Sequence, residues 1–420
     1  MQTLRADKNS PQSSLKVPVV WSAETTGGMA PLSYEFLYAD SNGQVLKQQG
    51  LSPSGEWWPA RAGTYRVKVV VRDQLDRAAH SPWSAEFEIS RPLVAVLPLQ
   101  NLSRAAAPLA MIRTEILSLL QGKGFDVVSD PDLQGFMAKH RMRKVGGING
   151  SLAEKLKEAT GAEALLITTL ELYDEQPPLK IALHCRLVSL ARSPEILWVD
   201  NVGLAGDDSA GLLGLGLIEE PEAMRSEALE ILVGSLAQSL ASNKKAAALA
   251  GKFQPKMARA ALDRAWEGKA KVAVPPFYNV SDRKYGGEIM ALHFLKALQE
   301  SERFTVIEPG VVHDELLRFR IIMDDGISIP QAEAMVSSFD ADFVLSGKVF
   351  DYQDTKGHWG GPVVDFSAEL FDNQNRRLVW TSKSYNAGSD GVFFFDWGRF
   401  TTASAMAAQM TRAISRLLSQ

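Results

Sequence analysis

The fold of this chain is decided by PLVAVLPLQNLS at residues 92–103, which recurs as KVAVPPFYNVS at residues 271–281. Each stretch is an apolar run that ends in a proline and a short polar turn, as is typical of a buried strand followed by a loop. The polar residues of the turns also match, and they are Asn101 with Ser103 and Asn279 with Ser281. One structural unit therefore occurs twice.

The same order of elements is expected after both stretches. Apolar residues with helical spacing follow at 109–120 in the first copy and at 290–298 in the second. A strand, two helices, three strands and a final helix complete each copy, giving the order β-α-β-α-α-β-β-β-α. The last strands share a tryptophan, Trp198 in one copy and Trp380 in the other. Chance does not easily produce this agreement, which favours a tandem repeat.

The residues before the first copy have a different pattern. Short runs rich in Val, Tyr, Phe and Trp alternate with turn signals over residues 15–90, as in a β-sandwich. This segment resembles bacterial immunoglobulin-like or fibronectin-like modules, and the resemblance is carried by Tyr34, Trp57, Trp58, Tyr65 and Val67.

The chain of 420 residues has the length of two to three domains. We predict a multi-domain protein, in which an N-terminal all-β immunoglobulin-like sandwich is followed by two tandem α/β domains, each a mixed sheet with flanking helices. The expected segments are a disordered tail (1–14), the sandwich (15–90), copy one (91–245), a helical linker rich in Ala and Lys (246–268) and copy two (269–420).

Both copies resemble a family of bacterial envelope proteins over about 150 residues each. The strings that carry the resemblance are VAVLPLQNLS and VAVPPFYNVS, then GAEALLITTLEL and ADFVLSGKVF, then EILWVDN and RLVWTSK. The family includes the N-terminal domain of TolB, the curli secretion channel CsgG, the activator LpoB and the flagellar ring protein FlgT. Copy one has Thr168-Thr169 where the family has a small glycine, and copy two keeps Ser346-Gly347.

The resemblance implies a CsgG-like or TolB-N-like α/β domain in each copy, a place in the cell envelope and function through protein–protein contacts. It supplies no active-site residues. We therefore expect a periplasmic protein associated with the outer membrane, with a cytoplasmic location as the alternative. The polar start of the chain fits either a cytosolic protein or a mature lipoprotein whose leader was removed.

Composition excludes several classes of function. A net charge of -4 gives no reason to expect nucleic-acid binding. No apolar stretch of about 18 residues is present, so no membrane-spanning helix is expected. The single cysteine, Cys185, excludes an intramolecular disulfide and a cysteine-based metal site.

The sequence predicts no catalytic residues, no metal site and no cofactor. No two of the six histidines have helix or hairpin spacing, and the glycines of GLLGLGL at 211–217 lack the ending of a phosphate loop. Cys185 lies on an apolar strand face, opposite to His184, which is typical of a core residue. His313-Asp314-Glu315 is read as a solvated helix start.

Two surfaces are candidates for contact with a partner. One is the basic cluster between the second and third helices of copy one, with Lys139, Arg141, Arg143 and Lys144. The other is a dense aromatic segment before the last helix of copy two, with Phe393, Phe394, Phe395, Trp397 and Phe400. It either packs onto the core or binds a partner.

These observations predict a non-catalytic scaffold or adaptor in a bacterial periplasmic or outer-membrane assembly. Its expected partners are envelope proteins, with self-association and contact with glycan or peptidoglycan as further expectations. The first alternative is an oligomeric ring or secretion-channel component. The second is a hydrolase or nucleotide-binding enzyme.

Overall fold

The computed structural model describes residues 3–419 apart from 17, 60, 209–215, 242–252, 261–267, 302, 321–330, 332–339, 355–360 and 391–398. Contacts divide the chain into two compact units. The first unit contains residues 1–93 with 120–126 and 237–244, and the second contains the remainder, including most of both copies.

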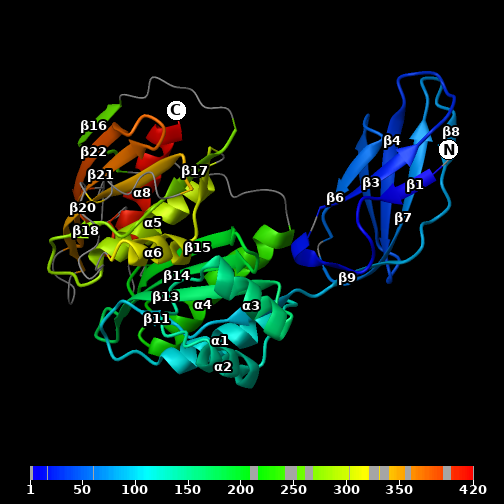
Figure 1. Ribbon diagram of the computed structural model, residues 1–420. Helices are drawn as coiled ribbons and strands as arrows, with labels where there is room; N and C mark the ends of the chain where they lie inside the picture. Colours follow the sequence, from blue (N-terminus) through cyan, green and yellow to red (C-terminus); the bar gives the residue numbers. More distant parts are fainter. Residues whose placement is uncertain are drawn as a thin grey trace. The chain divides into compact units, whose positions relative to one another are not determined.

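The N-terminal residues form two sheets (Figure 1). The three-stranded sheet contains β1 (Thr3–Ala6), β3 (Val19–Glu24) and β6 (Ser54–Trp57). The larger sheet contains β2 (Gln12–Ser13), β9 (Phe87–Ser90), β7 (Gly63–Arg72), β4 (Ser33–Asp40), β5 (Val45–Gly50) and β8 (Ala78–His80). Trp57 stacks on Tyr38 with ring centroids 5.3 Å apart and meets the edge of Phe87 at 6.0 Å, so side chains from both sheets share one aromatic core.

The prediction of a disordered tail at 1–14 is wrong for residues 3–14, which the structure describes. Thr3–Ala6 pair antiparallel with β3, and Gln12–Ser13 pair parallel with β9. Polar composition suggested disorder, but the edges of both sheets offer unpaired backbone groups that a polar strand can satisfy. The immunoglobulin-like identity of the region stays a prediction.

Copy one has the predicted order of elements. They are β10 (Leu93–Val96), β11 (Gln100–Asn101), α1 (Leu109–Gly122), β12 (Asp126–Val127), α2 (Asp130–Lys139), α3 (Gly150–Thr160), β13 (Ala164–Asp174), β14 (Lys180–Ser189), β15 (Ile196–Ala205) and α4 (Pro221–Ala241). The sheet order is β12-β10-β13-β14-β15, and β11 also pairs with β13. β10 lies parallel to β13, whereas β13, β14 and β15 form an antiparallel meander.

Copy two repeats this arrangement. Its elements are β17 (Ala270–Ala273), β18 (Tyr278–Asn279), α5 (Gly286–Glu300), β19 (Phe304–Val306), α6 (Pro309–Arg318), β20 (Phe343–Gln353), β21 (Val363–Asp372), β22 (Arg377–Ala387) and α8 (Ala403–Ser419). The sheet order is β22-β21-β20-β17-β19, and one additional strand, β16 (Met257–Ala260), pairs with β22. The predicted third helix of this copy falls almost entirely outside the described residues.

The repeat extends to individual hydrogen bonds. Asn101 donates to the carbonyl of Ala105 and accepts from the hydroxyl of Ser103 at 2.6 Å. Asn279 bonds the carbonyl of Arg283 and the hydroxyl of Ser281 in the same way, again with 2.6 Å to the hydroxyl. An Asn side chain that fixes its own turn explains why this residue recurs after both first strands.

The predicted helical linker over 246–268 is wrong where the structure describes it. Met257–Ala260 form β16, which pairs antiparallel with the edge strand β22. Alanine-rich composition favours a helix in isolation. Here the backbone hydrogen bonds offered by the sheet edge outweigh that weak preference.

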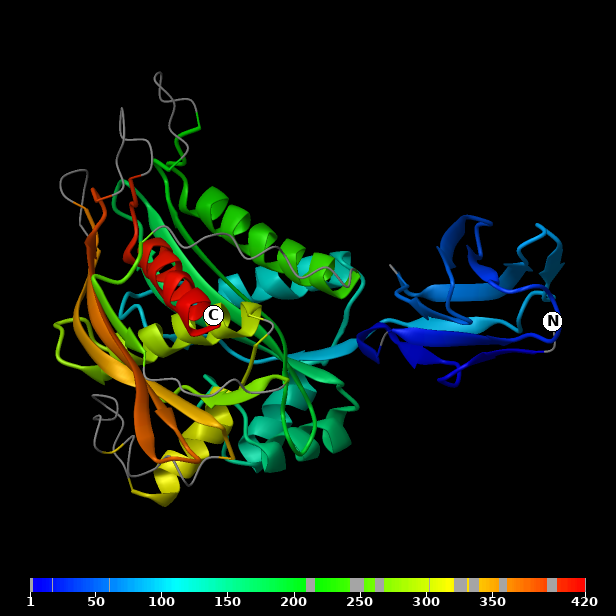
Figure 2. The same cartoon turned by 90° about the horizontal axis from the view of Figure 1, so that it is seen from above.

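The two copies are stacked in layers (Figures 1 and 2). Helices α5 and α8 lie between the two sheets, since they contact β15 of copy one as well as β20 and β21 of their own copy. The sheet of copy one is therefore covered on both faces, by α1 and α4 on one side and by copy two on the other. Every residue of β14 except Ser189 is buried, although its sequence alternates between apolar and polar side chains.

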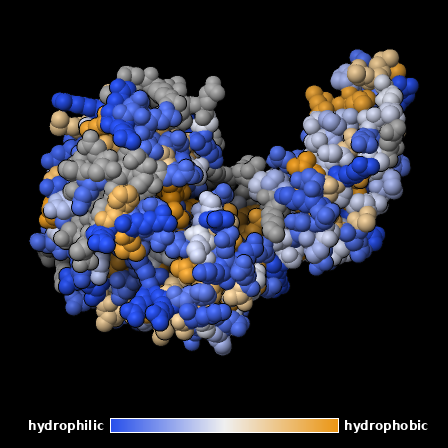
Figure 3. Space-filling view, in the orientation of Figure 1, coloured by the Kyte–Doolittle hydropathy of each residue, from blue (hydrophilic) through white to orange (hydrophobic). Residues whose placement is uncertain are grey.

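No helix in the described part of the chain is both long and apolar enough to cross a membrane. On the face shown in the space-filling view, apolar residues form small separate patches among hydrophilic ones (Figure 3).

Candidate functional site

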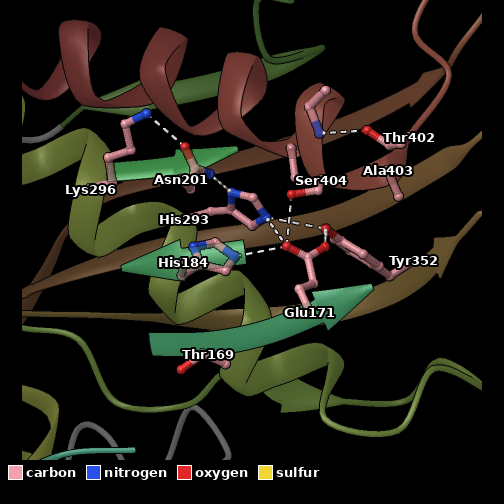
Figure 4. Close-up of polar contacts among 12 residues, drawn as sticks. Thr169, Glu171, His184, Asn201, His293, Lys296, Tyr352, Thr402, Ala403 and Ser404 are labelled. Atoms are coloured by element: carbon pink, nitrogen blue, oxygen red, sulfur yellow. Dashed lines mark hydrogen bonds and ion pairs between the residues drawn. The ribbon is translucent and has the colours of Figure 1, made fainter. Parts of the chain in front are cut away.

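The polar face of β14 and the end of β13 meet copy two at a buried cluster centred on Glu171 (Figure 4). The β13–β14 register shifts between Leu170 and Leu172, which makes Glu171 the extra residue of a β-bulge. Bulges redirect a side chain relative to the regular alternation of a strand. Glu171 is fully buried, and its carboxylate faces residues of copy two.

Four side chains from four different elements surround this carboxylate. His184 of β14 contacts Oε2 through Nε2 at 2.7 Å, and Ser404 of α8 donates its hydroxyl to the same oxygen at 2.7 Å. Tyr352 of β20 donates to Oε1. His293 of α5 places Nε2 at 3.3 Å from Oε2. Three of the four belong to copy two, so the carboxylate joins the copies.

Glu171 is ionised in this environment. Burial alone would raise the pKa of its carboxyl, but attraction to His293 and hydrogen bonds from the two histidines outweigh burial and hold that pKa well below its usual range. A buried carboxylate with this many donors is solvated by protein groups in place of water.

His184 is neutral at pH 7 and carries its proton on Nε2. Burial, followed by repulsion from His293, lowers the pKa of His184 to about 4. Because Nε2 faces a carboxylate oxygen, the proton of the neutral ring belongs there. Nδ1 of His184 is buried and has no hydrogen-bond partner among the described residues.

The His293 ring is held from behind by a chain of contacts. Lys296 donates to Oδ1 of Asn201 at 2.6 Å, which turns the amide nitrogen of Asn201 toward Nδ1 of His293 at 3.1 Å. The amide nitrogen of Asn201 therefore faces Nδ1, and Nε2 of His293 faces the carboxylate of Glu171. The same Nε2 also faces the hydroxyl of Tyr352.

This network decides between a metal site and a hydrogen-bonded cluster. Glu171, His184 and His293 each offer one ligand atom, and these atoms lie within 4.8 Å of one another. A histidine that binds a metal through Nε2 usually donates its Nδ1 proton to an acceptor. Among the described residues, Nδ1 of His293 meets a donor and Nδ1 of His184 has no hydrogen-bond partner, so neither ring has the acceptor behind Nδ1 that usually accompanies metal ligation through Nε2.

Sequence spacing did not reveal that His184 and His293 lie together, with ring centroids 4.6 Å apart. They come from different copies, and only the packing of one copy on the other joins them. One signal was available: polar His184 and Arg186 alternate with apolar residues in a strand whose other face is also buried.

A second buried pair joins the copies. Arg186 of β14 meets Glu308 at the start of α6 through two nitrogens, each 3.0 Å from a carboxylate oxygen. Arg186 also donates to the carbonyl of Gly146 at 2.6 Å, and Glu308 accepts from the backbone of Ile148 and Gly310. The pair therefore fixes the 146–148 loop of copy one against the first turn of α6.

Beside this pair lies a pocket of about 320 Å³ between the copies. Copy one contributes the segment from His140 to Leu152, and copy two contributes parts of α5 and α6. Three of the four predicted basic residues line it, namely Arg141, Arg143 and Lys144, and all three are exposed. Lys139 is exposed at the end of α2 and does not line the pocket.

His313 is half-buried within α6 and lines the same pocket, which corrects the expectation of a solvated helix start. Its Nδ1 lies 3.1 Å from Nζ of Lys144. Burial, followed by repulsion from Lys144, lowers the pKa of His313 to about 4. The ring is neutral at pH 7 and accepts from the lysine.

The aromatic candidates fall mostly outside the described residues, which exclude Phe393, Phe394, Phe395 and Trp397. Phe400 is described and half-buried. Its ring centroid lies 5.1 Å from that of Phe253, and it packs against the core of copy two. Of the two alternatives for the aromatic segment, Phe400 therefore fits packing onto the core.

Cys185 is buried, as predicted, on the face of β14 opposite to His184. Its sulfur lies 3.3 Å from the hydroxyl of Thr168, and burial raises the pKa of its thiol to about 12. A thiol in this state is an inert core group rather than a nucleophile.

No protein-family model matches the chain, and no curated protein matches it. Part of the chain is similar to solved structures. The PelC dodecamer of Paraburkholderia phytofirmans is 21% identical with a TM-score of 0.28, covering 39% of this chain and 98% of that one. Lipoprotein GNA1162 of Neisseria meningitidis is 18% identical with a TM-score of 0.26, covering 36% and 97%. The C-terminal domain of LpoB from Escherichia coli is 13% identical with a TM-score of 0.22, covering 29% and 86%.

Proposed function

We propose that this chain is a non-catalytic scaffold or adaptor in a bacterial periplasmic or outer-membrane assembly. The observation that supports the proposal is the position of the buried polar groups, which lie between the two copies. Glu171, His184 and His293 are at most 3% exposed, and they join the two copies instead of lining an opening to solvent. A scaffold needs its modules held together in this way, whereas a catalytic site needs its reactive groups within reach of a substrate.

The envelope location rests on the sequence strings shared by both copies with envelope proteins. The basic segment 141–144 is the exposed surface that we assign to the partner contact. It follows α2 and is rich in exposed charge, and the Arg186–Glu308 pair holds the 146–148 loop that comes directly after it. A rigid, charged loop favours rapid and oriented association with an acidic partner surface.

The test is photo-crosslinking in the cells from which the chain comes. A photoreactive residue replaces Arg143 in the full chain, and a matched control places it at Lys157, which is exposed on α3 and outside the pocket. We expect envelope proteins to be captured from position 143 and not from 157. Capture of cytosolic metabolic proteins alone, or identical products from both positions, would contradict the proposal.

A second candidate function is that of an oligomer component, and one observation favours it. The two copies associate through unlike surfaces, because a sheet face of copy one meets the helices of copy two. Contacts of this kind can repeat from one molecule to the next. The strand registers place Ser367 and Lys383 of copy two where copy one has His184 and Asn201. Lys383 is exposed and Tyr385 nearby is 47% exposed, so both side chains are accessible on this face of copy two.

The oligomer candidate predicts that the mass in solution rises with protein concentration, as read by light scattering. Tyr385→Asp should shift that rise to higher concentration, while Arg66→Asp in the N-terminal unit should leave it unchanged. A monomer mass across the whole concentration range would eliminate this candidate and leave the adaptor proposal intact.

A further inference from the structure

We propose that the pocket between the two copies binds an amphipathic anion, a small molecule with an apolar body and one acidic head group. This goes beyond a scaffold role, since it assigns a ligand to a place where the two copies meet. The size of the pocket, its apolar wall and its cationic rim support this assignment.

The size and wall suit an apolar body. The volume of about 320 Å³ lies at the lower end of the range of about 300–1,000 Å³ that is usual for ligand sites. Met142 and Leu152 of copy one line it together with Val274, Leu292 and Val312 of copy two. Four of these five are buried, so the wall is continuous with the core.

The rim suits an acidic head. Arg141 and Arg143 are exposed at the pocket, and among the described residues neither has an ion-pair partner. Two carboxylates, Glu288 and Asp314, also line the pocket, and Glu288 already accepts a hydrogen bond from Gln100 at 2.8 Å. A guanidinium matches the two oxygens of a carboxylate geometrically, which gives such a head a specific place.

Lys144 adds a further preference for an anion. Its ammonium is partly desolvated, and burial lowers its pKa, which attraction to Glu288 only partly opposes. It donates to the neutral ring of His313 rather than to a carboxylate. An acidic group that enters the pocket would add a countercharge next to this partly desolvated ammonium.

A ligand in this pocket would contact both copies at once. Gly147 and Gly310 already approach so closely that a Cβ on Gly147 would lie 2.6 Å from the backbone nitrogen of Gly310. Since a ligand stabilises the state that binds it, occupancy should strengthen the association of the copies. Binding of the ligand in the pocket would then change the stability of the whole unit that contains both copies.

The test is calorimetric titration of the full chain with decanoate, decanol and decylammonium, which share one apolar body. We expect decanoate to bind with one-to-one stoichiometry and at least about tenfold tighter than the other two, as a charge-assisted contact implies. The double variant Arg141→Glu/Arg143→Glu should lose that preference. The control Lys155→Glu/Lys157→Glu on the exposed face of α3 makes the same charge change outside the pocket and should keep it.

Ala291→Trp fills the pocket from α5 and should abolish binding of decanoate. If this variant does not fold, Leu317→Trp obstructs the rim from a position that is 53% exposed. Equal affinity for decanoate and decanol, or unchanged decanoate binding when the pocket is filled, would overturn the proposal.

Discussion

At the residue scale, the repeat shows how one backbone accommodates two sets of side chains. The registers equate Gly347 of copy two with Thr168 of copy one, and Phe277 with Leu99. A Cβ on Gly347 would lie 2.0 Å from the carbonyl of Ser367 and 2.6 Å from the ring of Phe277. The larger ring of Phe277 in copy two is therefore accommodated by a glycine beneath it, whereas the smaller Leu99 in copy one leaves room for Thr168.

This close approach predicts that Gly347→Ala destabilises the chain by about 1–3 kcal/mol, the usual cost of overpacking. The control is Gly135→Ala in α2, where an added Cβ meets nothing within 4 Å. It should instead stabilise by up to about 1 kcal/mol through helix propensity. Denaturant unfolding of both variants measures the difference, and equal effects would refute the packing argument.

The lowered pKa of His184 predicts that the stability of the folded chain depends on pH. Its pKa in the folded chain is about 4 and its ordinary value is 6.5, so the unfolded chain takes up a proton first as the pH falls. The stability from the neutral ring is present above pH 6.5 and is lost progressively toward pH 4, by up to about 3 kcal/mol at 1.36 kcal/mol per pKa unit.

His184→Gln keeps a donor for Glu171 but does not titrate. The difference in unfolding free energy between His184→Gln and the parent chain should therefore change between pH 6.5 and pH 4, with the parent losing more. Parallel stability curves for the two proteins over this range would show that His184 is not held neutral.

At the scale of elements, the Arg186–Glu308 pair connects β14 to α6 without contact with water. Removing one partner from a buried ion pair leaves the other uncompensated, so Arg186→Met should cost about 3–5 kcal/mol. Adding Glu308→Gln to this variant removes the unpaired carboxylate charge and keeps an oxygen that accepts from the backbone of Ile148 and Gly310. The double variant Arg186→Met/Glu308→Gln should recover most of the loss in denaturant unfolding, and a purely additive result would contradict this account.

The elements also show where local sequence preferences were sufficient. The helices α1 and α5 were predicted by apolar spacing and are confirmed. Strands β1, β2 and β16 were not predicted, because their residues have no periodicity of their own. Each pairs with an existing sheet edge, and such pairing depends on a partner that is distant in sequence.

At the scale of the whole molecule, the two copies depend on each other. The face of β14 that contains His184 and Arg186 would be exposed without copy two, and the core of copy two includes Leu102 and Ile196 from copy one. We predict that chains 1–245 and 246–420, expressed together as separate polypeptides, co-purify as one complex. Expression of chain 1–245 alone should give a protein that unfolds at lower temperature, as measured by calorimetry. Fragments that elute separately, each as stable as the full chain, would refute this dependence.

The sequence by itself determined the tandem repeat, the order of the described elements in each copy and the burial of Cys185. These follow from apolar periodicity and short turn motifs, which act over a few residues. Only the tertiary structure decided that Glu171, His184 and His293 meet, that Arg186 finds Glu308, and that the basic segment borders a pocket. Each of these depends on one copy packing against the other, and the free energy of that packing comes from surfaces whose partners are more than a hundred residues away along the chain.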